Sequence, residues 1–127
     1  LRAGHWKGWG PLQFIGGDIV GTTLGIYGMG RIGQAVARRA LGFDMRVIYT
    51  SRRRIDPALE TDLKAAYVDK DTLLAESDYL SVHCPYSPET HHAFKAGDFA
   101  KMKPTAAFIN TARGAVVDEA ALVHALK

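Results

Sequence analysis

The sequence predicts an α/β protein: a doubly wound, parallel β-sheet with helices on both faces. Short apolar runs alternate with helical patterns from residue 22 to residue 127. A strand pattern, a glycine turn, a helical pattern and a second strand pattern follow one another within residues 22–50, the order of a β–α–β unit. Such crossovers are right-handed and join parallel strands, so the repeated alternation indicates one open parallel sheet.

The first β–α–β unit has the clearest pattern. Residues 22–27 (TTLGIY) and 45–50 (MRVIYT) are short apolar runs, typical of buried strands. Between them, residues 31–42 (RIGQAVARRALG) predict a helix that ends at Gly42. The apolar stripe of this helix is predicted at Ile32, Val36 and Ala40.

The rest of the chain continues the alternation. Asp56 followed by Pro57, and later Asp118, are typical of helix starts, because a carboxylate caps free N–H groups and proline fits the first turn. The predicted order is helix, strand, helix, strand, short helix, strand and helix, at residues 56–63, 65–68, 69–77, 78–83, 97–103, 106–110 and 118–127.

Composition and charge narrow the class of protein. The chain has 127 residues, a formal charge of +3 and 47% hydrophobic residues, which is typical of one soluble globular domain. No apolar run reaches about 18 residues and no basic leader precedes a short apolar stretch, so neither a membrane span nor a signal peptide is predicted. The single cysteine, Cys84, forms no internal disulfide. We therefore expect a cytoplasmic protein with no membrane partner.

Two other kinds of site are not expected. The basic cluster Arg52–Arg54 lacks the interleaved aromatic residues of a nucleic-acid groove. Four potential metal ligands repeat no ligand spacing, and adjacent strand residues point to opposite faces. These four residues are His83, Cys84, His91 and His92. We expect no nucleic-acid partner and no metal, and we expect Cys84 to be a buried thiol rather than a nucleophile.

Residues 27–33 (YGMGRIG) contain a G-x-G-x-x-G pattern that follows a predicted strand and opens a predicted helix. Gly28 permits the tight turn, Gly30 lets the backbone approach a diphosphate, and Gly33 allows the helix to pack closely. The free N–H groups at the helix start attract phosphate. The context predicts a Rossmann-type, dinucleotide-binding domain over residues 22–127, preceded by a connector arm and lead-in over residues 1–21.

The residues after the second strand predict which dinucleotide is preferred. Ser51 stands where an acidic residue would bind the ribose hydroxyls and repel a 2′-phosphate, and arginines follow it. Arg52, with Arg53 or Arg54, would pair with that phosphate. We therefore expect NADP, with NAD as the second choice; the alternative is that these arginines are only a solvated loop.

The arm contains two tryptophans, Trp6 and Trp9, among glycines and without strand or helix periodicity. Tryptophan side chains are costly to leave in water. We expect the arm from Leu1 to Pro11 to be held by contacts outside the globular core.

The chain resembles the D-isomer-specific 2-hydroxyacid dehydrogenases. The resemblance rests on long, ordered stretches: GWGP, TLGIYGMGRIGQAVARRALGFDMRVIY, LLAESDYLSVHCPYSPET and MKPTAAFINTARGAVVDEAAL. It implies that this chain is a truncated cofactor-binding domain, incomplete at its C-terminal end. It also implies that Arg113, just after a predicted strand, is the catalytic arginine that holds the substrate. The expected cofactor-binding residues are Gly28, Met29, Gly30, Arg31, Ile32, Gly33, Ser51, Arg52, Arg53, His83, Cys84, Pro85, Thr90, Thr111, Ala112 and Arg113.

The resemblance implies an NADP-preferring oxidoreductase that reduces a small 2-oxo acid, of the glyoxylate or hydroxypyruvate type, to the D-2-hydroxy acid. The family's acid histidine and its glutamate lie beyond Lys127, so the chain alone is expected to be inactive. A homodimer is expected at full length. The alternative is a nicotinamide-sensing interaction protein, similar to the corepressors that share this fold.

Overall fold

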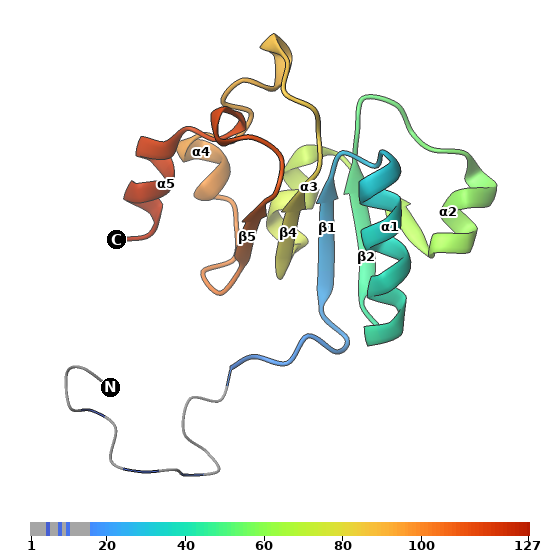
Figure 1. Cartoon of the computed structure of the whole chain (residues 1–127), viewed down its shortest axis with the longest axis horizontal. Helices are drawn as coiled ribbons and strands as arrows, with labels where there is room; N and C mark the ends of the chain where they lie inside the picture. Colours follow the sequence, from blue (N-terminus) through green and yellow to red (C-terminus); the bar gives the residue numbers. More distant parts are fainter. Residues whose placement is uncertain (1–4, 6–7, 9, 11–15) are drawn as a thin grey trace.

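The computed structural model describes residues 5, 8, 10 and 16–127 (Figure 1). Trp6 and Trp9 lie outside the described residues, so the expectation for the arm stays a prediction. Residues 16–21 lead into the sheet without forming a helix or a strand.

Five parallel strands form one sheet in the order β3-β2-β1-β4-β5, which confirms the predicted Rossmann-type α/β fold (Figure 1). The central strand β1 pairs with β2 on one side and β4 on the other, so that Leu24 lies opposite both Val47 and Tyr79. The strands are β1 (Thr23–Tyr27), β2 (Arg46–Thr50), β3 (Ala65–Tyr67), β4 (Tyr79–Val82) and β5 (Ala107–Asn110).

Helices cover both faces of the sheet. The helices α1 and α2 pack on one face and α3, α4 and α5 on the other; in Figure 1, α1 lies in front of the sheet and α3 behind it. Within the described part of the chain, none has the length and apolar character that crossing a membrane requires. The α-helices are α1 (Arg31–Ala40), α2 (Pro57–Leu63), α3 (Lys70–Glu76), α4 (Ala96–Phe99) and α5 (Glu119–Ala125). Three 3-10 turns are η1 (Leu41–Phe43), η2 (Pro88–Thr90) and η3 (Gly114–Val116).

Aspartates begin three of these helices, which confirms the caps predicted at Asp56 and Asp118 and adds Asp69. Each side chain accepts a backbone N–H that the helix itself leaves unpaired. The three donors are the N–H groups of Ala58, Ala121 and Thr72.

The buried face of α1 consists of small residues, and the predicted stripe is partly wrong. Ala40 is buried and Val36 packs partly buried against the core, as predicted, but Ile32, in the first turn of α1, is 66% exposed. The buried residues are Gly33, Ala37 and Ala40. The reason is close packing: a Cβ atom on Gly33 would overlap the carbonyl oxygen of Gly28. The helix therefore turns its smallest residues toward the sheet.

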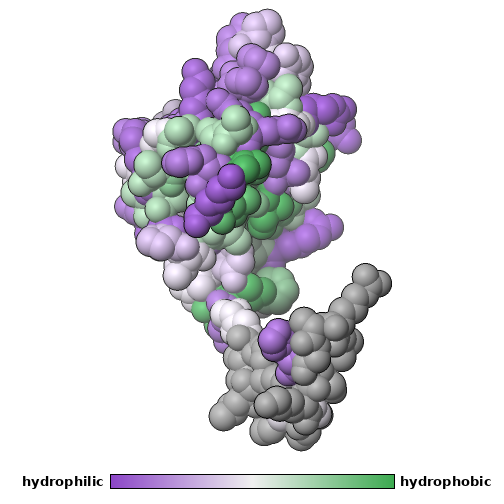
Figure 2. Space-filling view, turned by 90° about the vertical axis from the view of Figure 1, so that its left-hand side faces the viewer, coloured by the Kyte–Doolittle hydropathy of each residue, from purple (hydrophilic) through white to green (hydrophobic). Residues whose placement is uncertain are grey.

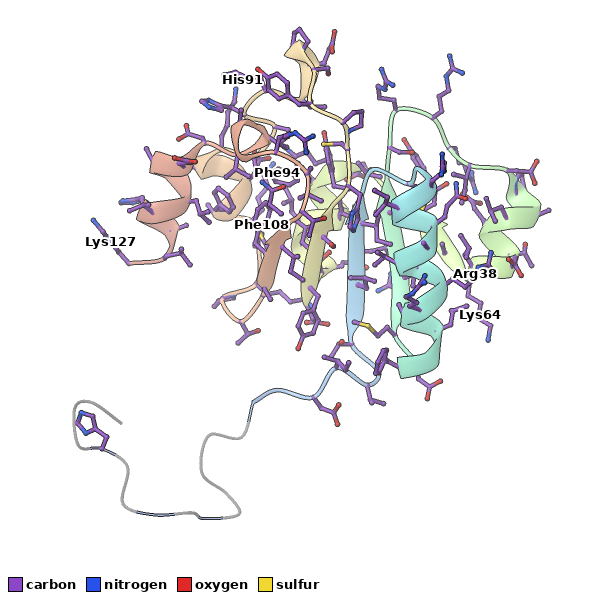
Figure 3. All side chains as sticks on the ribbon, viewed as in Figure 1. Arg38, Lys64, His91, Phe94, Phe108 and Lys127 are labelled. Atoms are coloured by element: carbon purple, nitrogen blue, oxygen red, sulfur yellow. The ribbon has the colours of Figure 1, made fainter. Side chains whose placement is uncertain are left out.

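Aromatic rings fill the core between the sheet and the helices α4 and α5. Phe94 is fully buried and lies beside Phe108 of β5, with the ring centroids 5.0 Å apart and the rings edge to face (Figure 3). Tyr27 contacts Phe94 in the same way at 4.9 Å, and Phe99 contacts Phe108 at 5.4 Å. These rings tie the end of β1 and strand β5 to the segment that follows β4.

Gly25 in the middle of β1 lets α3 approach the sheet. A Cβ atom there would overlap the side-chain oxygen of Ser77, which is fully buried and donates to the Leu73 carbonyl at 2.5 Å. The sequence predicts only a strand residue at this position, because a single glycine in an apolar run carries no sign of its partner.

We expect Gly25→Ala to lower the free energy of unfolding by about 1 to 3 kcal/mol, since the added methyl group overpacks a filled core. The measurement is denaturant unfolding. Gly42→Ala is the control, because nothing lies within 4 Å of a Cβ atom there. Gly25→Ala combined with Ser77→Ala should recover part of the loss; a double variant no more stable than the single one would refute the proposed overlap.

The side of the molecule that carries β5 and α5 presents apolar surface among hydrophilic residues (Figure 2). The strand β5 is the outermost strand of the sheet at this end. The exposed large hydrophobic residues are Ile109 on β5, Val123 on α5 and Leu126 directly after α5.

Candidate functional site

Four loops meet at one edge of the sheet, the upper edge in Figure 1, because parallel strands all end on the same side. They follow β1, β2, β4 and β5. From β1 the chain goes outward to β2 and β3 and then returns to β4 on the other side of β1, so the order of the strands reverses between β1 and β4. Open α/β sheets bind ligands in the crevice at such a reversal. Every predicted site residue lies in these loops or in the first turn of α1.

The glycine turn joins β1 to α1 with three different constraints. Gly28 has φ +104°, and a Cβ atom on it would lie 2.7 Å from the Cys84 nitrogen. Gly33 allows the close contact of α1 with the turn described above. At Gly30, by contrast, nothing lies within 4 Å of a Cβ position. Gly28 and Gly33 are thus required by packing, whereas Gly30 borders open space. Met29 between them is 4% exposed and packs into the core.

The start of α1 offers unpaired N–H groups. Gly30 is its N-cap and supplies no side-chain hydrogen bond, and no acidic residue stands in the first turn. Arg31 and Ile32 are exposed there. With Gly30 and His83, they line the upper part of a groove of about 650 Å³ that continues along α1. This helix end is therefore suited to an anion by its backbone and its dipole.

His83 follows β4 and is held from both sides of its ring. Its Nε2 atom lies 2.9 Å from the Ser81 hydroxyl and its Nδ1 atom 3.3 Å from the Thr111 hydroxyl. Burial lowers the pKa of His83, which favours the neutral imidazole. Two hydroxyls thus fix a neutral ring at the end of β4, facing the glycine turn. The sequence does not identify Ser81 as its partner.

The loop after His83 is closed by its own hydrogen bonds. The Thr90 hydroxyl donates to the Pro85 carbonyl at 2.9 Å and accepts the Ser87 N–H at 2.7 Å. Cys84 is 7% exposed, which confirms the predicted buried thiol, and burial raises the pKa of this thiol. The Thr90 side chain therefore stabilises the conformation of this loop.

The loop after β2 separates its three arginines. Ser51 donates to the Arg53 carbonyl and closes the turn. Arg52 and Arg53 are exposed, and neither forms an ion pair with any described residue. The pKa of Glu89 is lowered, first by a hydrogen bond with Ser87 and more weakly by the positive charge of Arg52.

Arg54 differs from the other two arginines. Its guanidinium donates to both carboxylate oxygens of Glu60, Nε and Nη2 each at 2.8 Å. Of the three arginines, only Arg52 and Arg53 are therefore unengaged. No motif in the sequence points to Glu60.

Arg113 lies in the loop after β5, beside Thr111 and Ala112. It is exposed, and its Nη1 atom donates to the Ala112 carbonyl at 2.8 Å. Asn110 shapes this loop: its side chain donates to the Arg113 carbonyl and accepts the Ala112 N–H, both at 3.0 Å. The structure thus brings Thr111 next to His83. Arg113 lies in the same loop as Thr111, and most of its guanidinium N–H groups donate to no described residue.

Three histidines, His83, His91 and His92, follow β4 and are potential metal ligands by residue type. Among the described residues no group of three or more His, Cys, Asp or Glu side chains is arranged to hold a metal ion. His91 and His92 stack on each other with ring centroids 3.9 Å apart, and Tyr86 packs edge to face on His91. These three rings form an aromatic cluster in which Tyr86 and His91 are exposed; His91 is labelled in Figure 3.

The arrangement fits a dinucleotide. The open space at Gly30 and the N–H groups at the start of α1 suit a diphosphate. An exposed, planar guanidinium such as that of Arg113 suits a carboxylate.

Comparison with known proteins gives the family. All 127 residues match the model of the D-isomer specific 2-hydroxyacid dehydrogenase, NAD binding domain. A glyoxylate reductase of Thermococcus litoralis is 53% identical over 100% of this chain, and one of Korarchaeum cryptofilum is 50% identical over 100%. The chain spans 39% and 38% of these two relatives.

Solved structures give the same fold. The D-lactate dehydrogenase of Escherichia coli superposes with a TM-score of 0.85 at 37% identity, over 91% of this chain and 36% of that one. The D-mandelate dehydrogenase of Rhodotorula graminis superposes with a TM-score of 0.84 at 38% identity, over 87% of this chain and 32% of that one. The glycine turn, the parallel sheet and these matches lead to one conclusion: the chain belongs to the D-isomer specific 2-hydroxyacid dehydrogenase family and matches its NAD binding domain.

Proposed function

We propose that the full-length protein reduces a small 2-oxo acid of the glyoxylate or hydroxypyruvate type to the D-2-hydroxy acid, and that it prefers NADPH to NADH. The observation that carries the reaction is the exposed Arg113 at the switch-point edge of the sheet, in a chain whose relatives include glyoxylate reductases. The division into an arm (1–21) and a dinucleotide-binding domain (22–127), and a homodimer at full length, belong to the same proposal.

In this proposal, different loops of the site bind different parts of the cofactor and the substrate. The turn at Gly28 to Gly33 and the start of α1 hold the diphosphate, while the ends of β4 and β5, with His83 and Thr111, line the nicotinamide half. A bound reduced nicotinamide supplies a hydride for the carbonyl carbon of the substrate. Arg113 binds the substrate carboxylate and stabilises the negative charge that develops on the carbonyl oxygen. The proton comes from the acid histidine that the resemblance implies beyond Lys127.

The preference for NADPH rests on the loop after β2. Ser51 carries no negative charge, so a 2′-phosphate meets no repulsion there. Arg52 and Arg53 are exposed and unpaired within the described structure, whereas Arg54 is bound to Glu60. Arg52 is the first choice for the phosphate contact and Arg53 the second.

We expect the wild-type full-length protein to bind NADPH roughly 10- to 100-fold more tightly than NADH, because one charge-assisted contact contributes about 1.5 to 3 kcal/mol. Arg52→Ala should weaken NADPH binding and leave NADH binding nearly unchanged, and Ser51→Asp should shift the preference toward NADH. Calorimetric titration measures both cofactors, and added salt should reduce the preference.

Arg46→Ala is the matched control for Arg52→Ala. Arg46 begins β2, at the opposite edge of the sheet, and is paired with Glu76 at 2.6 Å. Equal affinity of the wild-type protein for both cofactors would show that the arginines only solvate the loop.

The reaction itself is tested by incubating the full-length protein with glyoxylate or hydroxypyruvate and either reduced cofactor. Oxidation of the cofactor, followed at its absorbance band, together with formation of the D-2-hydroxy acid, is expected. Cofactor binding without turnover of either acid would instead favour a nicotinamide-sensing interaction protein.

A further inference from the structure

The loop between β2 and α2, residues 51–56, is anchored to the helix α2. Its anchor is Arg54, whose guanidinium forms a two-pronged contact with the Glu60 carboxylate, Nε to Oε1 and Nη2 to Oε2, each at 2.8 Å. Two parallel N–H···O bonds fix the orientation of both groups as well as their distance. The side chain that follows the two free arginines is therefore held rigidly against α2.

Glu60 is buried and is bound from a second side. It is 8% exposed, and its Oε1 atom accepts the hydroxyl of Tyr49 at 2.6 Å. Tyr49 is fully buried in β2, and its hydroxyl oxygen accepts the backbone N–H of Ile55 at 3.0 Å. Four groups from the strand, the loop and the helix thus join in one network. We name Tyr49, Arg54 and Glu60 the Glu60 cluster.

The charges of the Glu60 cluster are stable across the neutral range. Hydrogen bonds from Arg54 and then from Tyr49 lower the pKa of Glu60 to about 2, and burial with the bond to Glu60 raises the pKa of Tyr49 to about 12. The Arg54 guanidinium also lies over the Tyr67 ring of β3, 5.9 Å from its centroid, and the Tyr49 ring packs edge to face on Tyr67 at 5.3 Å. The network is thus packed as well as hydrogen-bonded.

The segment between the end of β2 and the Glu60 cluster is short and is held at both ends. Before it, Thr50 ends β2, with its carbonyl accepting the Gly28 N–H at 2.8 Å. After it, Arg54 and Ile55 are tied to Glu60 and Tyr49. Only three residues separate these points, and two of them are the exposed Arg52 and Arg53.

Arg52 and Arg53 therefore project from a loop whose backbone is ordered before any ligand arrives. Ordering a mobile loop on binding costs free energy that a preorganised loop avoids. A preorganised loop also limits where a guanidinium can reach, so a supporting contact can change selectivity without touching the ligand.

We propose that the Glu60 cluster is a positioning device for cofactor selectivity: by anchoring Arg54 and Ile55, it holds Arg52 and Arg53 where they meet the 2′-phosphate of NADPH. This inference rests on the proposed preference for NADPH. Arg54 and Glu60 are positioning residues and make no contact with the cofactor.

The test compares variants of the full-length protein by the KM for NADPH and for NADH at saturating glyoxylate, together with kcat and the melting temperature. Glu60→Gln keeps the shape of the side chain but removes its charge. It should raise the KM for NADPH about tenfold and change the KM for NADH and both kcat values less than twofold, because only the phosphate contact depends on the position of the loop. Tyr49→Phe removes the hydroxyl that joins Glu60 to Ile55 and should act in the same direction.

Asp62→Asn is the matched control. Asp62 lies on the same helix and pairs with Arg38 at 2.9 Å on the surface, with 56% of each side chain exposed. It should leave the ratio of the two KM values unchanged. Arg54→Gln, at an exposed side chain, replaces Glu60→Gln if the latter does not fold.

The outcomes separate the inference from the function on which it rests. A wild-type protein that prefers NADPH, with a Glu60→Gln or Arg54→Gln variant that keeps the same preference, overturns the positioning role alone. Equal losses for both cofactors also overturn it, since that is the result of a general structural role. A wild-type protein without a preference for NADPH overturns the proposed preference and this inference together.

Discussion

Replacing Arg113 by Ala in the full-length protein is expected to lower kcat/KM for glyoxylate by roughly 150-fold, or about 3 kcal/mol of transition-state stabilisation. The guanidinium is exposed in the loop after β5, and its only described hydrogen bond goes to the neighbouring Ala112 carbonyl. It is therefore available to a ligand in the crevice. Charge on the carbonyl oxygen develops during the reaction, so removing the arginine should affect kcat as well as KM.

Arg113→Lys separates the two properties of this side chain. Lysine keeps the positive charge but lacks the planar pair of donors that binds a carboxylate. We expect the loss of kcat/KM in Arg113→Lys to be smaller than that in Arg113→Ala. An unchanged kcat/KM in Arg113→Ala would make Arg113 an ordinary surface residue of the loop.

Gly28→Ala is expected to lower the free energy of unfolding by about 2 to 4 kcal/mol, the sum of backbone strain and a steric clash. Gly28 has φ +104°, which alanine adopts only with strain, and the new Cβ atom would lie 2.7 Å from the Cys84 nitrogen. Because that neighbour is backbone, it has little freedom to move. Urea denaturation of the full-length protein measures the loss.

Gly30→Ala is the matched variant with the opposite expectation. Its backbone is extended, at φ −78°, and nothing lies within 4 Å of the new Cβ atom. The stability should therefore change by less than about 1 kcal/mol. Binding of either cofactor should weaken at least about tenfold, since the methyl group enters space that a diphosphate needs. A Gly30→Ala variant that binds both cofactors normally would remove Gly30 from the site.

The sequence was sufficient for elements whose pattern is local. The apolar runs that became β1, β2, β4 and β5, and the aspartate caps, depend on residues within a few positions of each other. Even β3, only three residues long, lies inside its predicted range. The outward position of Ile32 could not be predicted in this way, because it depends on how closely α1 approaches the glycine turn.

The candidate site follows the same rule: the residues of local motifs could be identified from the sequence, and the contacts made by packing could not. The glycine turn and Ser51 stand in a local motif, whereas the assignment of Arg113 came from resemblance to a family rather than from the pattern of residues. The sequence gives no sign that Arg54 differs from Arg52 and Arg53, because the difference is a contact with Glu60 that exists only once α2 packs beside β2. The contact of Ser81 with His83 and the close approach of Gly25 to Ser77 depend equally on packing.

The pairing of β1 with β4 has a consequence for how the chain folds. The Thr23 N–H donates to the Asp78 carboxylate at 2.8 Å, a contact that spans 55 residues. Contacts between residues so far apart in the sequence form late in folding, because closing the long loop between them costs entropy before the contacts stabilise the chain. The β1, α1 and β2 unit can assemble from neighbouring residues, but the crevice beside β1 cannot exist until β4 has been synthesised and has docked. A dinucleotide should therefore find no specific site on the chain before β4 has docked, and should stabilise the protein by slowing the unfolding of the completed sheet.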